Sequence, residues 1–223
     1  MLDRVISSYT PTLRALVEAR AGTRAAGSER MLFVGMPQTP GQADLPNVRA
    51  EEQLLTGLFG DRCTPLVGAR AGRDTVLAEL LTHGWVHFAC HGEQNLEDPS
   101  RGGLLIQDGV LTVTDLSAQQ YQGDFAYLSG CKTAVGGTSL PDEAITLAAA
   151  LHYTGYRHVI ATLWSVWDAE AARVARDVYQ ALAPAGVLDA DGAAAALHHA
   201  VRGLRAERRD RPSVWTPFAH TGP

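Results

Sequence analysis

The stretch YLSGCKT at residues 127–133 predicts a buried strand that ends in a glycine and brings the thiol of Cys131 to the edge of a sheet. An earlier stretch, VHFACHG at residues 86–92, has the same layout, with the imidazole of His91 at the strand end and Gly92 directly after it. One strand end therefore offers a nucleophile and the other a base.

Length and composition favour a single folded domain. The chain has 223 residues, 46% of them hydrophobic, which is enough for one substantial core and short for two. We expect one domain over residues 1–223, with a lead-in helix within residues 1–30 and the core in residues 31–223. The net charge of −5 provides no basic surface for a polyanion, so nucleic acid is not an expected direct partner.

Several features favour a cytoplasmic protein. No apolar run reaches the roughly 18 residues that a membrane-spanning helix needs, and residues 1–10 lack the basic and then apolar layout of a secretory signal. Three cysteines, Cys63, Cys90 and Cys131, are too few for a disulfide framework, which fits a reducing compartment where a free thiol survives. We therefore expect no membrane partner.

Strand and helix patterns alternate from residue 31 onward. Apolar runs predict strands at residues 31–36, 64–68, 85–90, 125–128 and 157–164. Amphipathic runs predict helices at residues 48–59, 74–83, 142–153, 169–182 and 193–207. This alternation predicts an α/β fold with a mainly parallel central sheet and helices on both faces.

Shorter elements complete the pattern. A short helix is expected to lead into the core at residues 10–20, and a hairpin interrupts the β-α rhythm at residues 104–106 and 110–112. Thr114 or Asp115 is expected to start a short helix, and residues 215–220 to form a terminal strand. Asn47 and Asp191 are predicted to cap the helices that follow them.

The residues at the two predicted strand ends, His91 and Cys131, suit a thiol nucleophile with an imidazole base. Neighbouring parallel strands would place His91 and Cys131 at one edge, where the imidazole takes the proton of a thiol whose ordinary pKa is about 8.5. Such general-base help is worth on the order of 10²–10⁴ in rate. Gly92 and Cys131 would supply backbone N–H groups for a developing oxyanion.

Structural interpretations stay open beside the catalytic one. A cysteine after a buried strand also serves as a small core residue, and a strand-end histidine also serves as a satisfied structural residue. Cys90 lies inside the strand register and is expected in the core. No C-x-x-C or H-x-x-x-H spacing supports a metal at Cys90, His91 and Cys131, and the phosphate-loop pattern lacks its first glycine, so we expect neither metal nor cofactor.

Five motifs in chain order resemble those of the CHAT domain family: FACHG at 88–92, LSGCKTA at 128–134, DEA at 142–144, ATLWSVWD at 161–168 and PSVWTPF at 212–218. The resemblance implies a caspase-like three-layer fold of the clan that includes separases. It also implies a cysteine endopeptidase that cleaves protein substrates, with His91 and Cys131 as the catalytic dyad and the oxyanion hole at Gly92 and Cys131. The alternative is a catalytically silent module that recruits a partner.

The same resemblance implies how the peptidase is controlled and what it cleaves. The family commonly carries its peptidase behind tetratricopeptide repeats or another sensor, so we expect a regulatory sensor domain or activator protein outside this chain. Separase-like relatives keep an acidic residue after the Leu-Trp strand, where Asp168 stands, and a carboxylate there would pair with a basic P1 side chain. Asp168 and Asp142 are equally interpretable as helix caps, and Glu143 as a brace for the loop after the nucleophile.

Overall fold

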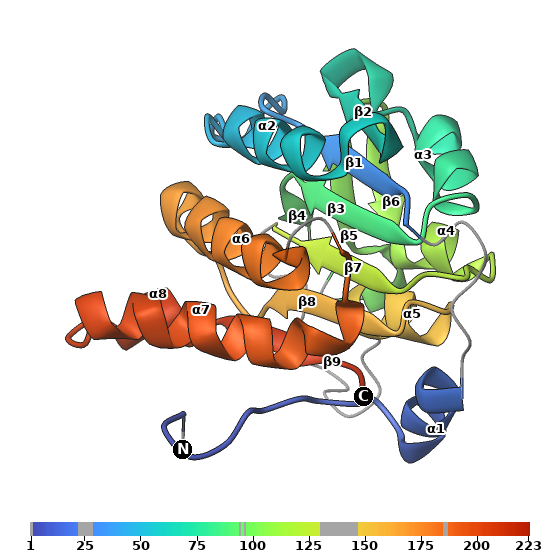
Figure 1. The fold of residues 1–223 in the computed structure, drawn as a ribbon. Helices are drawn as coiled ribbons and strands as arrows, with labels where there is room; N and C mark the ends of the chain where they lie inside the picture. Colours follow the sequence, from blue (N-terminus) through green and yellow to red (C-terminus); the bar gives the residue numbers. More distant parts are fainter. Residues whose placement is uncertain (1, 22–28, 94, 96, 130–146, 185–186) are drawn as a thin grey trace.

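The computed structural model describes residues 2–21, 29–93, 95, 97–129, 147–184 and 187–223. Its main feature is a six-stranded sheet with helices on both faces (Figure 1). In sheet order the strands are β2 (Cys63–Val67), β1 (Met31–Gly35), β3 (Trp85–Ala89), β7 (Phe125–Leu128), β8 (His158–Thr162) and β9 (Phe218–Thr221). The predicted α/β class is confirmed.

The sheet is parallel except at one edge. Strands β2, β1, β3, β7 and β8 run in parallel, and β9 pairs antiparallel with β8. Strands β3 and β7, which precede His91 and Cys131, are neighbours, with Phe88 of β3 in register with Leu128 of β7. Carboxyl ends of adjacent parallel strands meet at one edge of a sheet, which is where sites form in such folds.

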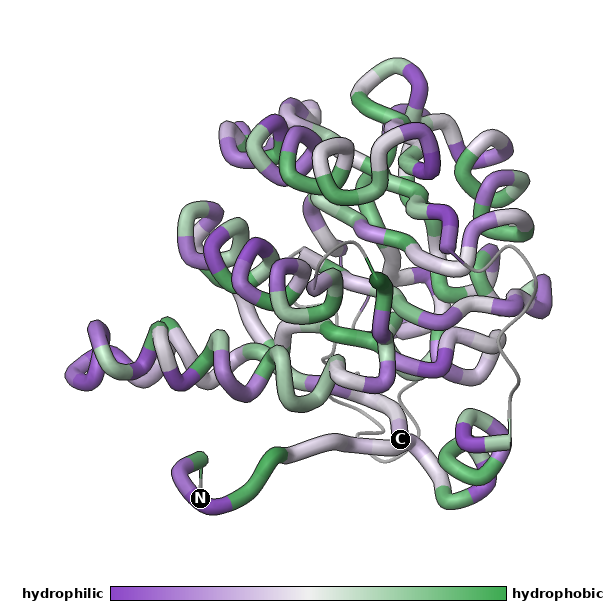
Figure 2. The backbone as a smooth tube through the Cα atoms, in the orientation of Figure 1, coloured by the Kyte–Doolittle hydropathy of each residue, from purple (hydrophilic) through white to green (hydrophobic). Residues whose placement is uncertain are grey.

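Alternate residues of each strand face two separate cores, as the period of a strand requires. Trp85 and His87 face the helices α2 (Val48–Phe59), α6 (Asp168–Leu182) and α7 (Ala193–Glu207). Val86 and Phe88 face the helices α3 (Arg73–Leu80), α4 (Val113–Ser117) and α5 (Leu147–Tyr153). Figure 2 shows hydrophobic segments concentrated in the strands and on the inner turns of the helices.

A second, smaller sheet contains a strand that the sequence did not suggest. The predicted hairpin is confirmed as β5 (Gly103–Ile106) and β6 (Gly109–Thr112). The two-residue strand β4 (Gly92–Glu93) joins it antiparallel, directly after His91. The helix α4 begins at Val113, before the expected Thr114 or Asp115, because Thr112 caps it, with Asp115 completing a capping box.

Two expected helix caps make other contacts. Asn47 stands at the N-cap position of α2, but its side chain makes no capping bond there. Asp191 lies in a 3₁₀ turn before α7, whose N-cap is Gly192, and its carboxylate binds Arg157 at 2.8 Å. Both predictions of side-chain capping were therefore wrong: the Asn47 side-chain amide donates to Asp168, and the Asp191 carboxylate accepts from Arg157.

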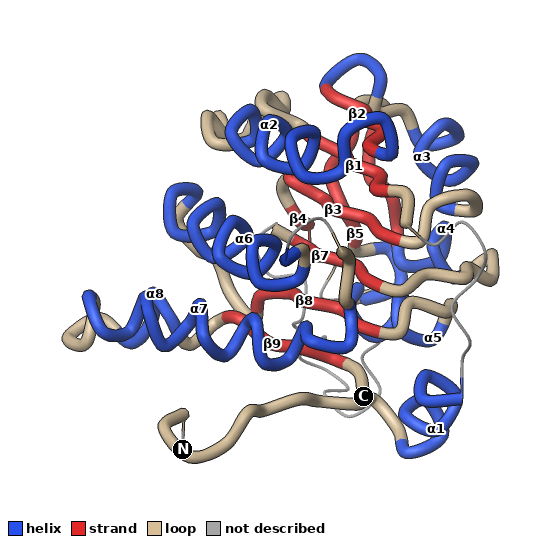
Figure 3. The backbone as a smooth tube through the Cα atoms, viewed as in Figure 1, coloured by secondary structure: helices blue, strands red, loops and turns tan. Residues whose placement is uncertain are grey.

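Both ends of the chain lie next to the edge strand β9. Before helix α1 (Leu13–Ala21), the N-terminal segment runs as a loop past the C-terminus (Figure 3), and Tyr9 forms an isolated parallel bridge with Thr221. Helix α8 (Pro212–Trp215) precedes β9. Helix α1 leaves Leu13 79% exposed.

Among the described helices, none has the length and apolar character that crossing a membrane requires.

Candidate active site

A small cleft opens at the carboxyl ends of β3 and β7. It brings together the end of β3, the start of α2, the end of β7 and the start of α6. The lining residues are Leu45, Val48, Glu51, Ala89, Cys90, His91, Ser129, Val166, Asp168 and Ala171. His91 and Asp168, which the sequence singled out separately, therefore line the same cleft.

The partly exposed His91 ring is oriented by a backbone carbonyl. Its Nε2 atom lies 2.7 Å from the oxygen of Ala43, in the loop between β1 and α2. A carbonyl only accepts hydrogen bonds, so Nε2 carries the hydrogen and Nδ1 of the neutral ring keeps its lone pair. The contact therefore leaves His91 with one nitrogen available as a base.

The end of β7 is fixed to β3 next to this histidine. The Ser129 amide donates to the Phe88 carbonyl at 2.8 Å, which extends the ladder one step beyond the strand itself. Cys131 lies outside the described residues, and so do Asp142 and Glu143. The described chain thus reaches the residue two positions before the expected nucleophile.

The Gly92 N–H points away from the small sheet. The Leu105 amide donates to the His91 carbonyl at 2.8 Å, while Gly92 is in register with Leu104. In an antiparallel ladder this makes Gly92 and Leu104 a non-hydrogen-bonded pair, whose N–H groups face away from the partner strand. The Gly92 N–H is therefore left available to a ligand.

Sequence reasoning missed a buried polar group beside the cleft. Glu51 on α2 is only 4% exposed, and its Oε1 accepts a hydrogen bond of 2.9 Å from the Ser129 hydroxyl. Its Oε2 lies 3.4 Å from Nε2 of the fully buried His87. The available signal was an acid within the apolar face of α2, between Val48 and Leu55.

The two described thiols are held in their neutral form. Burial raises the pKa of Cys90 to about 12, with a smaller contribution from the Glu51 carboxylate. Burial likewise raises the pKa of Cys63 to about 11, helped by the charge of Glu52. Cys90 packs in the core on the α3 side, as expected. Neither thiol is therefore suited to nucleophilic chemistry at neutral pH.

Asp168 has a different structural role from the cap considered for it. Trp167 is the N-cap residue of α6, and Asp168 is the first residue inside the helix. Its Oδ2 accepts two bonds from Asn47, 2.9 Å from the backbone amide and 2.6 Å from the side-chain amide. This carboxylate therefore ties α6 to the start of α2, and its Oδ1 has no partner among the described residues.

No group of three or more metal-ligating side chains occurs in the part of the chain that the structure describes. The groups at this edge are therefore an oriented imidazole, two carboxylates from Glu51 and Asp168, and beside them the Gly92 N–H, which faces away from β5.

Comparisons with known proteins identify the family and the fold of the chain. The family model described as CHAT domain matches residues 1–223, so the chain belongs to the CHAT domain family. No curated protein sequence matches the chain closely enough to count as a relative. The fold is similar to that of caspase-like cysteine peptidases of known structure, and the predicted caspase-like fold is confirmed.

Three solved structures illustrate the similarity. The Arg-specific cysteine proteinase gingipain R (RgpB) has a TM-score of 0.64 at 12% identity, over 94% of this chain and 50% of its own. The complex of Porphyromonas gingivalis RgpB pro- and mature domains has a TM-score of 0.63 at 10% identity, over 87% of this chain and 47% of its own. The Saccharomyces cerevisiae separase–securin complex has a TM-score of 0.67 at 12% identity, over 96% of this chain and 14% of its own. The chain thus spans about half of the gingipain chains and a much smaller share of separase.

Proposed function

We propose that the protein is a cysteine endopeptidase that cleaves protein substrates with a His91–Cys131 dyad. The observation that carries the proposal is the parallel register of Phe88 with Leu128, because His91 and Cys131 each follow their paired residue by three positions. Ser129 lines the cleft, and two residues of chain span at most about 7 Å, which supports the proposed place of Cys131 beside it.

In the proposed reaction, Nδ1 of His91 takes the proton of the Cys131 thiol. The thiolate attacks the carbonyl carbon of the scissile peptide bond, and the C–N bond then breaks as the imidazolium returns its proton to the leaving amine. Water, deprotonated by the same imidazole, hydrolyses the thioester and releases the carboxylate product and the free thiol. The bond from His91 to the Ala43 carbonyl supports this assignment because it stabilises the imidazolium that forms.

The oxyanion of the tetrahedral intermediate is assigned to backbone donors. The Gly92 N–H, which faces away from β5, supports this role, and the Cys131 N–H is the second proposed donor. Removing one such donor from a comparable site costs about 10²–10³ in rate.

Substrate choice is proposed to favour a basic P1 side chain. Asp168 supports this because its carboxylate lines the cleft with His91 and has one oxygen without a partner among the described residues. Asp142 is the second proposed contributor. Regulation is proposed to come from a sensor domain or activator protein, such as tetratricopeptide repeats, as the family resemblance implies.

The function is tested by comparing new protein N-termini in cells that express the wild type or Cys131→Ala. The peptidase predicts a set of cleavage sites that is present only with the wild type. Identical sets of N-termini, with both proteins folded and equally expressed, would instead support the catalytically silent interaction module.

A further inference from the structure

Glu51 is a buried carboxylate bonded to the last described residue before the expected nucleophile. We propose that Glu51 is a positioning residue that, through the Ser129 hydroxyl, fixes the end of β7 from which the chain continues to Cys131. This inference rests on the proposed peptidase function and adds a residue to it. Glu51 acts through Ser129 and is not itself assigned a contact with substrate.

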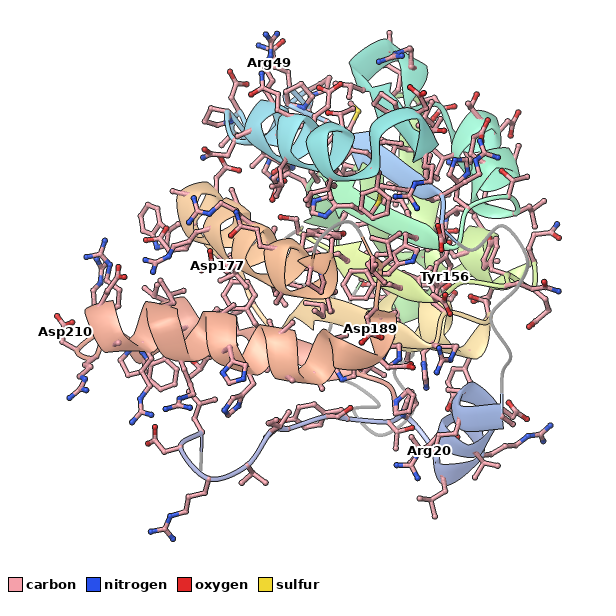
Figure 4. All side chains as sticks on the ribbon, in the orientation of Figure 1. Arg20, Arg49, Tyr156, Asp177, Asp189 and Asp210 are labelled. Atoms are coloured by element: carbon pink, nitrogen blue, oxygen red, sulfur yellow. The ribbon has the colours of Figure 1, made fainter. Side chains whose placement is uncertain are left out.

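The placement of Glu51 is costly for the fold. It lies on the buried face of α2 with Val48, Leu55 and Phe59, and it is the charged member of that set. Removing a carboxylate from water destabilises the fold unless hydrogen bonds compensate. An apolar side chain would pack there at less cost, so the role of Glu51 follows from the contacts that its carboxylate makes. The exposed Arg49, by contrast, points outward from α2 (Figure 4).

The buried His87 of β3 lies next to Glu51. The His87 ring is stacked between Phe33 and Tyr127, with ring centroids 5.4 Å and 5.1 Å apart. Its Nδ1 lies 3.1 Å from the Tyr179 hydroxyl, and its Nε2 lies 3.4 Å from Glu51, outside hydrogen-bonding geometry. The two stacked rings and the Tyr179 hydroxyl therefore keep the His87 ring in place beside the Glu51 carboxylate.

These contacts fix the end of β7 in two directions. The Ser129 amide binds the Phe88 carbonyl of β3 at 2.8 Å, and the Ser129 hydroxyl binds Glu51 of α2 at 2.9 Å. The Glu51 carboxylate also lines the cleft with His91. Because a misplacement of about 1 Å can cost on the order of 10² in rate, fixing Ser129 controls how well Cys131 meets the imidazole.

The test measures the rate at which iodoacetamide modifies Cys131 in the full chain between pH 6 and 9, with the site read by mass spectrometry. Ser129→Ala and Glu51→Leu each remove the bond, and Ser129→Thr restores a hydroxyl. Thr64→Val is the matched control, because it removes a part-buried hydrogen bond between Thr64 and His83. Thr64 lies on β2, at the edge of the sheet away from β7. Circular dichroism and thermal unfolding verify that each variant is folded.

Ser129→Ala is expected to slow modification about ten-fold or more and to move the pH midpoint upward, toward the value of about 8.5 of a free thiol. Ser129→Thr should recover the wild-type rate within about three-fold, and Thr64→Val should not change it. The double variant Glu51→Leu/Ser129→Ala should be no slower than Ser129→Ala alone. If Glu51→Leu does not fold, Ser129→Ala and Ser129→Thr still decide the matter.

Two failures are distinguishable with His91→Ala. If His91→Ala slows modification but Ser129→Ala leaves both rate and pH midpoint unchanged, the positioning role of Glu51 is wrong and the dyad stands. If Cys131 is modified in His91→Ala at the wild-type rate, the proposed function fails, and the role of Glu51 fails with it.

Discussion

The Nε2 atom of His91 lies 2.7 Å from the carbonyl oxygen of Ala43, a residue 48 positions earlier in the chain. The contact requires a hydrogen on Nε2, which fixes the tautomer of the neutral ring. The orientation of the proposed base is therefore set by the loop that connects β1 to α2.

This relationship predicts the protonation pattern of His91. In spectra of protein labelled with ¹⁵N-histidine above pH 8, the two-bond ¹⁵N–¹H correlations should identify His91 as the Nε2–H form, assigned by comparison with His91→Ala. A neutral His91 with its hydrogen on Nδ1 would contradict the role given to that nitrogen as base.

The raised pKa values of the other thiols predict that Cys131→Ala loses almost all reactivity. At pH 7.5, pKa values of about 11 for Cys63 and about 12 for Cys90 leave fewer than about one thiolate in a thousand. Alkylation of folded Cys131→Ala should therefore be slower than that of the wild type by about two orders of magnitude or more. Rapid labelling of Cys63 or Cys90 in the folded variant would contradict this assignment.

The position of Asp168 predicts a change in substrate preference. Asp168→Asn keeps an acceptor for Asn47 and removes the charge, so cleavage after Arg or Lys should fall about ten-fold or more relative to cleavage after neutral residues. A peptide library measures this ratio. Asp177→Asn is the control, on the same helix (Figure 4). Nine residues of helix separate it from Asp168, which is about 14 Å along the helix axis. An unchanged ratio in Asp168→Asn would remove Asp168 from the specificity pocket.

Buried histidines predict a loss of stability in acid. Burial, followed by the neighbouring His158 and His152, lowers the pKa of His220 to about 3, whereas an unfolded histidine titrates near 6.5. Between about pH 6.5 and 3, His220 therefore binds a proton in the unfolded chain but stays neutral in the folded chain. The stability contributed by neutral His220 is lost as pH falls through this range.

Between pH 7.5 and 5.0 this linkage for His220 alone is worth about 2 kcal/mol of unfolding free energy. Urea unfolding at the two pH values should show a smaller difference in His220→Gln than in the wild type. His199→Gln, an exposed position on α7, is the control and should keep the wild-type difference. Equal pH dependence in His220→Gln and the wild type would contradict the prediction.

Much of the fold was predictable because it depends on local patterns. The apolar runs before Cys131 and His91 predicted the strands β7 and β3, and turn residues predicted the hairpin. The strand β4 was missed because two residues carry no periodicity, and it forms only by pairing with β5.

The contacts of the candidate site were less predictable. A backbone carbonyl such as that of Ala43 leaves no mark in the sequence, although it orients His91. The bond between Asn47 and Asp168 joins residues 121 positions apart, so both were interpreted through the nearby helix starts. Glu51 gave a signal, an acid on an apolar helix face, but its partners are known only once β7 and β3 lie beside α2.

The most direct test of the His91–Cys131 dyad is mass spectrometry of the protein after treatment with a peptidyl acyloxymethyl ketone carrying Arg at P1. The account predicts a single thioether adduct on Cys131, formed with loss of the acyloxy group and at least about 100-fold slower in folded His91→Ala. An adduct on Cys63 or Cys90, or the same rate of Cys131 modification without His91, would contradict it.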